Sequence, residues 1–466
     1  MDQIHQLKDH KISALIWRFS IPAMVGMIIN ALYNIVDRIY IGNAPDLGAN
    51  GLAALTIAFP IMLIVLAVGV LFGIGGATLF SIRLGQNKPN DAKDALATSF
   101  FLVVVVGLII SALGLVFLDD ILLIFGASEV ILPFAEDYMG IIFFGTTFQM
   151  IALAMNNFIR ADGRPKMAMM TMLLGALTNI ILDPIFIFGF NMGIAGAAYA
   201  TIIAQAISAL WVASYFLHGK ANIPLKLKEI KPHPLIIPTI LSLGLPGFSL
   251  QLAASVLNAF INRTLFAYGG DIAVSGMGII NSIQTFMILP IIGLNQGIQP
   301  IISYNFGAKQ FDRVRETVKL GITYATLIVT VGYVITRLVP GVLVGIFNRE
   351  EALMSFGIMA IRSWFLLLPL VGFQIIASNF FQAIGRAKTA MFLTLTRQVI
   401  ILLPAVLIFP QYFGLQGLLY AAPFADVISA TLTFIFFIIA MKNLEHYTLK
   451  EHPSAMSDAL LDASAS

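Results

Sequence analysis

The segments NFIRADGRPKMAMM (157–170) and NFFQAIGRAKTAMF (379–392) share eight of their fourteen residues and lie 222 residues apart. A second pair repeats at nearly the same distance, because GIAGAAYA (193–200) matches GLQGLLYA (414–421) at an offset of 221. Insertions in loops produce such small drifts in the offset. The sequence therefore predicts two related halves with the same number of structural elements in each.

The composition places both halves in a membrane. Of the 466 residues, 59% are hydrophobic and 11% are charged, and the mean hydropathy is +0.91, whereas soluble domains carry about 25% charged residues. The polar start, MDQIHQLKDHK (1–11), lacks a cleavage signal, so we expect the first apolar stretch to be a spanning helix. The absence of cysteine excludes disulfides and thiolate chemistry.

A spanning helix needs roughly 20 mostly apolar residues, and this criterion predicts six spans in each half. We therefore expect an all-α polytopic membrane protein with two six-helix bundles, related by a pseudo-two-fold axis along the membrane normal. The twelve predicted spans lie near residues 14–41, 52–81, 96–117, 131–158, 167–190, 194–218, 237–263, 273–303, 318–338, 355–383, 389–410 and 414–441. The predicted domains are an N-terminal lobe (1–217), a cytoplasmic linker (218–235), a C-terminal lobe (236–442) and a cytoplasmic tail (443–466).

The loops alternate in charge. The N-terminal segment, every second loop after it and the segment after the last span together hold 21 of the 27 lysines and arginines, among them Arg160, Arg164 and Lys166 between the fourth and fifth spans. The opposite loops carry acids such as Asp119 and Glu350. By the positive-inside rule, both termini are predicted to be cytoplasmic.

A parallel repeat of this kind is typical of transporters that bind a substrate between their halves and open to each side in turn. A channel would need a selectivity-filter segment, and the sequence contains none of the typical ones. No ATP-binding motif, no nucleophile–base pair and no basic patch interleaved with aromatic residues occurs. We therefore expect no ATP-driven transport, no enzyme activity and no nucleic-acid binding.

Two carboxylates lie inside predicted spans of the first half and have no counterpart in the second. Asp37 aligns with Ile261, and Asp183 aligns with Leu403, although the proline that follows Asp183 recurs. A residue needed only for helix geometry would tend to recur, as the proline does. Ionisable residues at membrane depth usually mark ion or proton pathways, so these acids indicate a function that belongs to the first half.

Other oxygen-bearing side chains are expected near these acids. Asn179 lies one turn from Asp183 on the same helix face, and Thr201 in the next span lies at a similar depth, roughly 10 Å from the outer end. This set suits a hard cation such as Na⁺, or two acids in a medium of low dielectric could share a proton. A structural alternative makes Asp37 an interfacial acid paired with Arg38, and leaves Asp183 without an ion to bind.

Taken together, these residues resemble the multidrug and toxic compound extrusion (MATE) family. The resemblance covers nearly the whole chain and combines the 6+6 repeat, the aspartate in NIVDRIYIG (34–42), the fifth-span residues Asn179, Asp183 and Pro184, and Thr201. The segments GRPK (163–166) and GRAK (385–388) are similar to those of its bacterial MepA-like and DinF-like branches.

The resemblance implies a V-shaped pair of bundles in a bacterial inner membrane that exports lipophilic cationic drugs, antibiotics among them, in exchange for H⁺ or Na⁺. It implies no other cofactor, contact with membrane lipid, and a monomer. It assigns the coupling cation, with Na⁺ as a possible metal ion, to Asp37, Asn179, Asp183 and Thr201. It also implies helix bends at Pro22 and Pro184 and a functional tyrosine at Tyr138.

We expect the N-terminal part of the substrate cleft to be lined by Asn30, Tyr33, Asn34, Tyr138, Asn156 and Met172. The second half departs from some family members because its seventh and tenth spans contain no acid, so a cation site there is not expected. Asp426 is its one deep acid, and Arg397 is its predicted partner.

Two other functions fit parts of the sequence. A flippase of lipid-linked saccharides, with a related fold, would need a cationic cavity, and deep arginines are few, namely Arg397 and Arg362. A non-transporting membrane receptor or scaffold would need large soluble loops and no buried carboxylates, which is the opposite of this pattern.

Overall fold

The computed structural model describes residues 7–42, 44, 48–218, 221–347 and 349–447. Within these residues every regular element is a helix, which confirms the predicted all-α class. Residues 219–220 of the predicted linker and 448–466 of the predicted tail lie outside the described part.

Each half of the chain folds into its own bundle. The N lobe contains α2 (Ile12–Gly42), α3 (Gly48–Gly85), α4 (Pro89–Val116), α5 (Leu118–Ile124), α6 (Leu132–Ala161), α7 (Pro165–Pro184), the π-helical turn η1 (Ile185–Gly189) and α8 (Gly193–Leu217). After the short η2 (Leu227–Glu229), the C lobe contains α9 (Ile237–Gly307), α10 (Phe311–Leu338), α11 (Pro340–Gly345), α12 (Glu351–Trp364), α13 (Leu368–Ala383), α14 (Ala387–Leu395), the π-helical η3 (Thr396–Leu402), α15 (Leu403–Lys442) and η4 (Leu444–His446).

The helices account for the twelve predicted spans. Ten helices among the described residues are long and apolar enough to cross a membrane, and α12 with α13, bent by 51°, make an eleventh span. One of the ten is Ala387–Lys442, whose 56 residues would extend roughly 84 Å as one straight helix, against roughly 30 Å of bilayer hydrocarbon. Gly414 within it has φ 58°, so the chain turns there and crosses twice.

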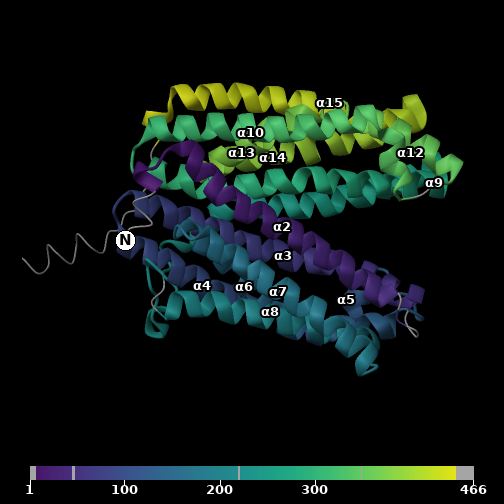
Figure 1. Ribbon diagram of the computed structural model, residues 1–466, viewed down its shortest axis with the longest axis horizontal. Coiled ribbons are helices and arrows are strands. Elements are labelled where there is room, and N and C mark those ends of the chain that lie inside the picture. The colour runs from purple at the N-terminus through teal and green to yellow at the C-terminus, as the bar shows by residue number, and fades with distance from the viewer. Residues whose placement is uncertain (1–6, 43, 45–47, 219–220, 348, 448–466) are drawn as a thin grey trace, which may run out of the picture.

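The two bundles lie close together at one end and diverge toward the other, which gives a V (Figure 1). The closed end carries basic residues, for example Arg83 in the last turn of α3, Lys88 in the loop after it and Lys309 after α9. We call this the basic end. The helices α5 and α12 lie at the opposite, divergent end (Figure 1).

At the basic end, α3 and α9 approach each other so closely that only glycine fits. A Cβ atom on Gly75 of α3 would lie 2.1 Å from the carbonyl oxygen of Ile240, and one on Gly244 of α9 would lie 1.8 Å from that of Leu71. Glycine permits such backbone contact between membrane helices. We call this set of contacts between the lobes the glycine seam.

The glycine seam follows the internal repeat. Gly297, which corresponds to Gly75 at an offset of 222, packs its α-carbon against Ser20 of α2 in the same way. Closer to the basic end, a Cβ on Gly85 would lie 2.0 Å from the carbonyl oxygen of Tyr304, and one on Gly307 would lie 2.1 Å from that of Ile82. The lobes therefore meet through matching residues.

The helix α2 contacts both lobes and crosses between them (Figure 1). In its first half, the Ser20 hydroxyl donates a hydrogen bond to the carbonyl of Leu294 in the C lobe at 3.3 Å. Near its end, the Tyr40 ring lies 6.2 Å from that of Phe188 in the N lobe. Pro22, a predicted bend, lies within the continuous helix, two residues after Ser20.

The residues before α2 are held by the C lobe. Arg313 of α10 donates hydrogen bonds to the carbonyls of Leu7 and His10 at 3.0 and 2.8 Å, and Asn305 also donates to Leu7. Leu7 is 1% exposed, so the start of the described chain is an integral part of the second bundle.

Candidate functional site

The two predicted acids meet where α2 passes the end of α7. The carboxyl groups of Asp37 and Asp183 lie within hydrogen-bonding contact of each other. Asn179 donates one hydrogen bond to Asp183 Oδ1 at 3.1 Å and another to the Thr201 hydroxyl at 3.3 Å. The structure thus brings together all four residues predicted to hold the coupling ion, and we call them the acid cluster.

Three oxygen atoms of the acid cluster are buried without a protein hydrogen-bond partner: Asp37 Oδ1, Asp183 Oδ2 and Asn179 Oδ1. Facing carboxylates in a medium of low polarity repel each other unless a proton or a cation lies between them. Over the described part of the chain, no group of three or more His, Cys, Asp or Glu side chains could hold a metal ion.

The helix that carries Asp183 becomes irregular directly after it. Pro184 has no N–H to donate within the helix, and the chain passes from α7 directly into the wide turn η1 after it. Asp183, the residue before this irregularity, is fully buried. The guanidinium of Arg38, a suggested partner of Asp37, lies over the Phe59 ring at 5.7 Å.

A cavity of about 300 Å³ lies beside the acid cluster inside the N lobe. Its walls come from α2, α3, α6, α7 and α8, and Gln296 of α9 contributes from the C lobe. Along α3 it extends from Phe59 to Ile74, which is roughly 22 Å of helix. Its volume falls in the range of small-molecule sites.

The cavity walls include most of the predicted cleft residues. Asn30, Tyr33, Asn34, Asn156 and Met172 line it, as do Asn179 and Thr201 of the acid cluster. Tyr138 is not among the lining residues, because its side chain is 2% exposed and packs in the apolar core of the N lobe.

The prediction that placed Arg160 in a basic loop is wrong. The helix α6 continues to Ala161, and Arg160 is 5% exposed and lines the floor of the cavity toward the basic end. Its guanidinium donates hydrogen bonds to the Oδ1 atoms of Asn156 and Asn157. A cation in the last turn of a helix is also stabilised by the helix carbonyls, which helps to explain its burial.

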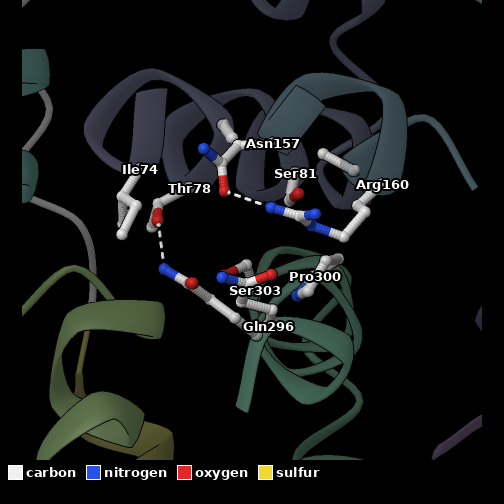
Figure 2. A pocket seen from close by; sticks show the side chains of 11 residues that line it. Ile74, Thr78, Ser81, Asn157, Arg160, Gln296, Pro300 and Ser303 are labelled. Atoms are coloured by element: carbon white, nitrogen blue, oxygen red, sulfur yellow. Dashed lines mark hydrogen bonds between the residues drawn. The ribbon is translucent and has the colours of Figure 1, made fainter. Parts of the chain in front are cut away.

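The floor continues into a narrow polar gap between the lobes. Figure 2 shows Arg160 and Asn157 on the N-lobe side facing Gln296 and Ser303 of α9. Nearby, Gln299 donates a hydrogen bond across the gap to Thr78 at 3.0 Å. One signal of this arrangement is present in the sequence, since Asn157 and Asn156 lie three and four residues before Arg160, within reach of its guanidinium.

The C lobe contains a different charged pair. Arg397 Nε lies 2.7 Å from Asp426 Oδ1, and the Asp426 side chain is 3% exposed. The predicted pairing is therefore confirmed. This acid already has a cation of the protein beside it, whereas Asp183 forms no ion pair with any of the residues that the structure describes.

Between α6 and α7, Asp162 connects the linker to the N lobe. Its Oδ2 accepts hydrogen bonds from the Tyr215 hydroxyl at 2.5 Å and from the backbone N–H of Asn222 at 2.9 Å. Burial raises the pKa of Asp162 to about 6, although these hydrogen bonds act in the opposite direction. The carboxyl is therefore ionised at neutral pH and protonated in mild acid.

A comparison of the sequence with models of known protein families finds the same internal repeat. Residues 22–185 and 246–407 each match the family model MatE, so one model covers both lobes in turn.

Individual relatives extend over nearly the whole chain. The multidrug export protein MepA of Staphylococcus haemolyticus is 28% identical over 442 residues, which cover 95% of this chain and 96% of that protein. A ligand-bound structure of the MATE multidrug transporter DinF-BH is 38% identical, with a TM-score of 0.86, and covers 93% of this chain and 97% of that one. A MATE structure in complex with MaL6 has a TM-score of 0.90 at 25% identity and covers 96% of this chain and 100% of that one.

Proposed function

We propose that this chain, which belongs to the MatE family, is a secondary transporter that exports lipophilic organic cations in exchange for H⁺ or Na⁺. The observation that carries the proposal is the contact between Asp37 and Asp183 beside a cavity of about 300 Å³. The names of its relatives, a multidrug export protein and a multidrug transporter, support the same function.

The acid cluster supports coupling because its charge depends on the ion it holds. With H⁺ or Na⁺ bound, the two carboxylates can remain in contact. Without the ion, their repulsion favours separation of α2 from α7, and the carboxylates attract an organic cation instead. Ion and drug would then compete for the same charge, which is the requirement for exchange.

The path of α2 supports a link between this competition and the lobes. Its end carries Asp37 in the N lobe, while Ser20 near its beginning is bonded to the C lobe. A movement of α2 at the acid cluster would therefore change contacts at the glycine seam. Opening of the seam, with closure of the divergent end, would expose the cavity on the other side of the membrane, as alternating access requires.

The charge pattern supports one orientation for this multi-pass membrane protein. The basic end would face the cytoplasm of a bacterium, with both termini on that side of the inner membrane. The cavity would then open outward in the present conformation. The exposed apolar side chains around both bundles would contact lipid. One chain, with its two lobes, would act as a monomer.

The test uses the purified protein in liposomes. Efflux of a fluorescent cationic dye is followed under an imposed pH gradient and, separately, under a Na⁺ gradient. We expect one gradient to drive efflux and to identify the ion, and we expect Asp183→Asn to reduce efflux to the level of liposomes without protein. Asp119→Asn, the same chemical change in α5 at the divergent end, is the matched control and should transport normally.

Two results would contradict the proposal. Normal efflux by Asp183→Asn would make the buried acid structural. A lack of dye movement under either gradient would reject export of organic cations, and lipid-linked saccharides would then be the substrates to test.

A further inference from the structure

The floor of the cavity contains a buried cation without a carboxylate partner. Arg160 is 5% exposed, and it forms no ion pair with any of the residues that the structure describes. Buried charges are normally paired, because removal from water is costly. Arg397 in the C lobe follows this rule through Asp426, whereas Arg160 does not.

The two amides that contact Arg160 are fixed by their own hydrogen bonds. Asn156 Nδ2 donates to the Ala168 carbonyl at 2.7 Å, and Asn157 Nδ2 donates to the Leu153 carbonyl at 3.0 Å. Both oxygen ends are therefore turned toward the guanidinium. Neutral oxygens orient the cation but leave its full positive charge in the floor of the cavity.

Polar groups without partners face the same place. Gln296 Oε1 lines this floor and Ser81 Oγ lines the narrow gap next to it, and both atoms are buried without a protein hydrogen-bond partner. Arginine has five N–H donors, and the amides use two of those on Arg160. A carboxylate in the cavity between Arg160 and Gln296 would accept from the guanidinium and, after rotation of the amide, from Gln296.

The internal repeat shows that the fold does not require the charge. Gln382 occupies the position that corresponds to Arg160 at an offset of 222. It is also buried, at 4% exposure, and donates a hydrogen bond to the Leu243 carbonyl at 2.7 Å. A neutral side chain is thus sufficient for packing at this place in the bundle, and the arginine of the N lobe has another role.

We infer that the floor around Arg160 binds a carboxylate group of the transported molecule, so that the preferred substrates are amphiphilic zwitterions. Their carboxylate lies at Arg160 and their cationic end lies toward the acid cluster. This inference rests on the proposed function, because it takes the cavity to be the substrate site. A substrate with a positive charge and no carboxylate would occupy only the end of the site near the acid cluster.

The first experiment measures binding of two xanthene dyes, rhodamine 110 and its methyl ester, to the detergent-solubilised protein by fluorescence anisotropy. The dyes differ only in whether the carboxyl group is free. A charge-assisted hydrogen bond contributes enough to predict roughly tenfold tighter binding of the free acid. Arg160→Gln should remove this preference and Arg160→Lys should retain part of it, while Arg337→Gln, at the end of α10 and away from the cavity, should leave it intact.

Equal binding of the two dyes to the native protein would overturn the inference and leave cation export standing. An equal loss of binding for both dyes in Arg160→Gln would also overturn it, because that result would show that Arg160 has a structural role. If neither dye binds, the proposed function is in doubt, and the second experiment decides the inference alone.

The second experiment uses only the native protein and no dye, so it does not depend on whether a variant folds. It compares the unfolding temperature of the native protein in benzoate and in benzamide, which have the same shape but differ in charge. We expect only benzoate to raise the temperature, because a ligand that binds the folded state stabilises it. The same effect of both compounds, or of neither, would contradict a carboxylate site, whether the carboxylate is free or part of a substrate.

Discussion

The two lobes carry matching residues where they meet and different residues where they surround their interiors. In the glycine seam, Gly75 corresponds to Gly297 and Gly85 corresponds to Gly307, and each makes close contact with the other lobe. The acid cluster of the N lobe has no such match. By the offsets of the repeat, its four positions are occupied in the C lobe by Ile261, Leu403, Val399 and Ala422.

This difference separates the requirements of movement from those of chemistry. Two rigid bodies that rock about a shared axis need equivalent contacts on both sides of that axis, so the seam keeps the symmetry of the repeat. Binding of one ion and one drug needs a single site, so charge is concentrated in one lobe. In the other lobe, Arg397 and Asp426 neutralise each other.

The largest expected effect is a block of transport by a side chain in the glycine seam. Gly75→Val would place a Cβ 2.1 Å from the carbonyl oxygen of Ile240, and a backbone atom cannot easily move aside. We expect the closed-seam state to lose roughly 10- to 100-fold in population and dye efflux to fall accordingly. Gly297→Val should have the same effect, because it is the symmetry mate.

The control for the seam is Gly278→Val, because a Cβ atom on Gly278 of α9 would have no neighbouring atom within 4 Å. Seam opening can be read independently from the labelling of Thr78→Cys by a thiol reagent, since the chain has no cysteine of its own. Wild-type efflux by Gly75→Val would show that the seam does not have to close.

The next effect concerns the neutral members of the acid cluster. The double change Asn179→Val and Thr201→Ala gives the N lobe the residues of the C lobe. It removes two oxygen groups from the ion's surroundings, so we expect the ion concentration for half-maximal transport to rise at least about tenfold. The reverse change in the C lobe, Val399→Asn with Ala422→Thr, should leave coupling unaltered, and a similar effect of both pairs would contradict a single ion site.

A smaller effect, on stability rather than coupling, is expected in the C lobe. Asp426→Asn leaves Arg397, whose side chain is 18% exposed, without its counter-charge, and the loss of a partner from a buried pair typically costs up to about 3 kcal/mol. Equilibrium unfolding in detergent should show this loss, while the gradient that drives efflux stays the same. Replacement of both partners, Asp426→Leu with Arg397→Met, should recover most of the stability, and a loss of coupling in that double variant would show that the pair acts in transport.

The smallest effect is a pH dependence at Asp162, whose C-lobe counterpart is Ile384. Its pKa is about 6 in the folded protein against a usual 3.8, so the folded state binds the proton more strongly. Stability from this group is therefore present below pH 4 and is lost as pH rises to about 6, by up to about 3 kcal/mol. Asp162→Asn should make the unfolding temperature less dependent on pH between pH 4 and 6. An unchanged dependence would show that other groups cause it.

Much of this organisation could be predicted from the sequence because it depends on patterns along the chain. The repeat indicated two lobes, apolar length indicated the spans, and the loss of Asp37 and Asp183 from the second half indicated where the ion site lies. The spacing of Asn179 and Asp183 on one helix face was sufficient to place them together.

The remaining features depend on how helices meet. Arg160 lies at the end of a span, where a basic residue is usually explained by topology, and only the packing of α6 against α3 and α9 shows that it is buried. The seam glycines could not be distinguished from the many other glycines of the spans, because close approach is a property of two helices. Tyr138 lies on a predicted span as expected, but its side chain packs in the core rather than along the cavity.

The capture of the first helix by the second lobe has a consequence for biogenesis. Leu7 and Ser20 contact Arg313 and Leu294, partners that lie 306 and 274 residues later in the chain. The ribosome releases the first helix into the membrane long before these partners are synthesised. The helix α2 therefore cannot reach its final position until α9 and the start of α10 have been synthesised, and its contacts with the C lobe form only then.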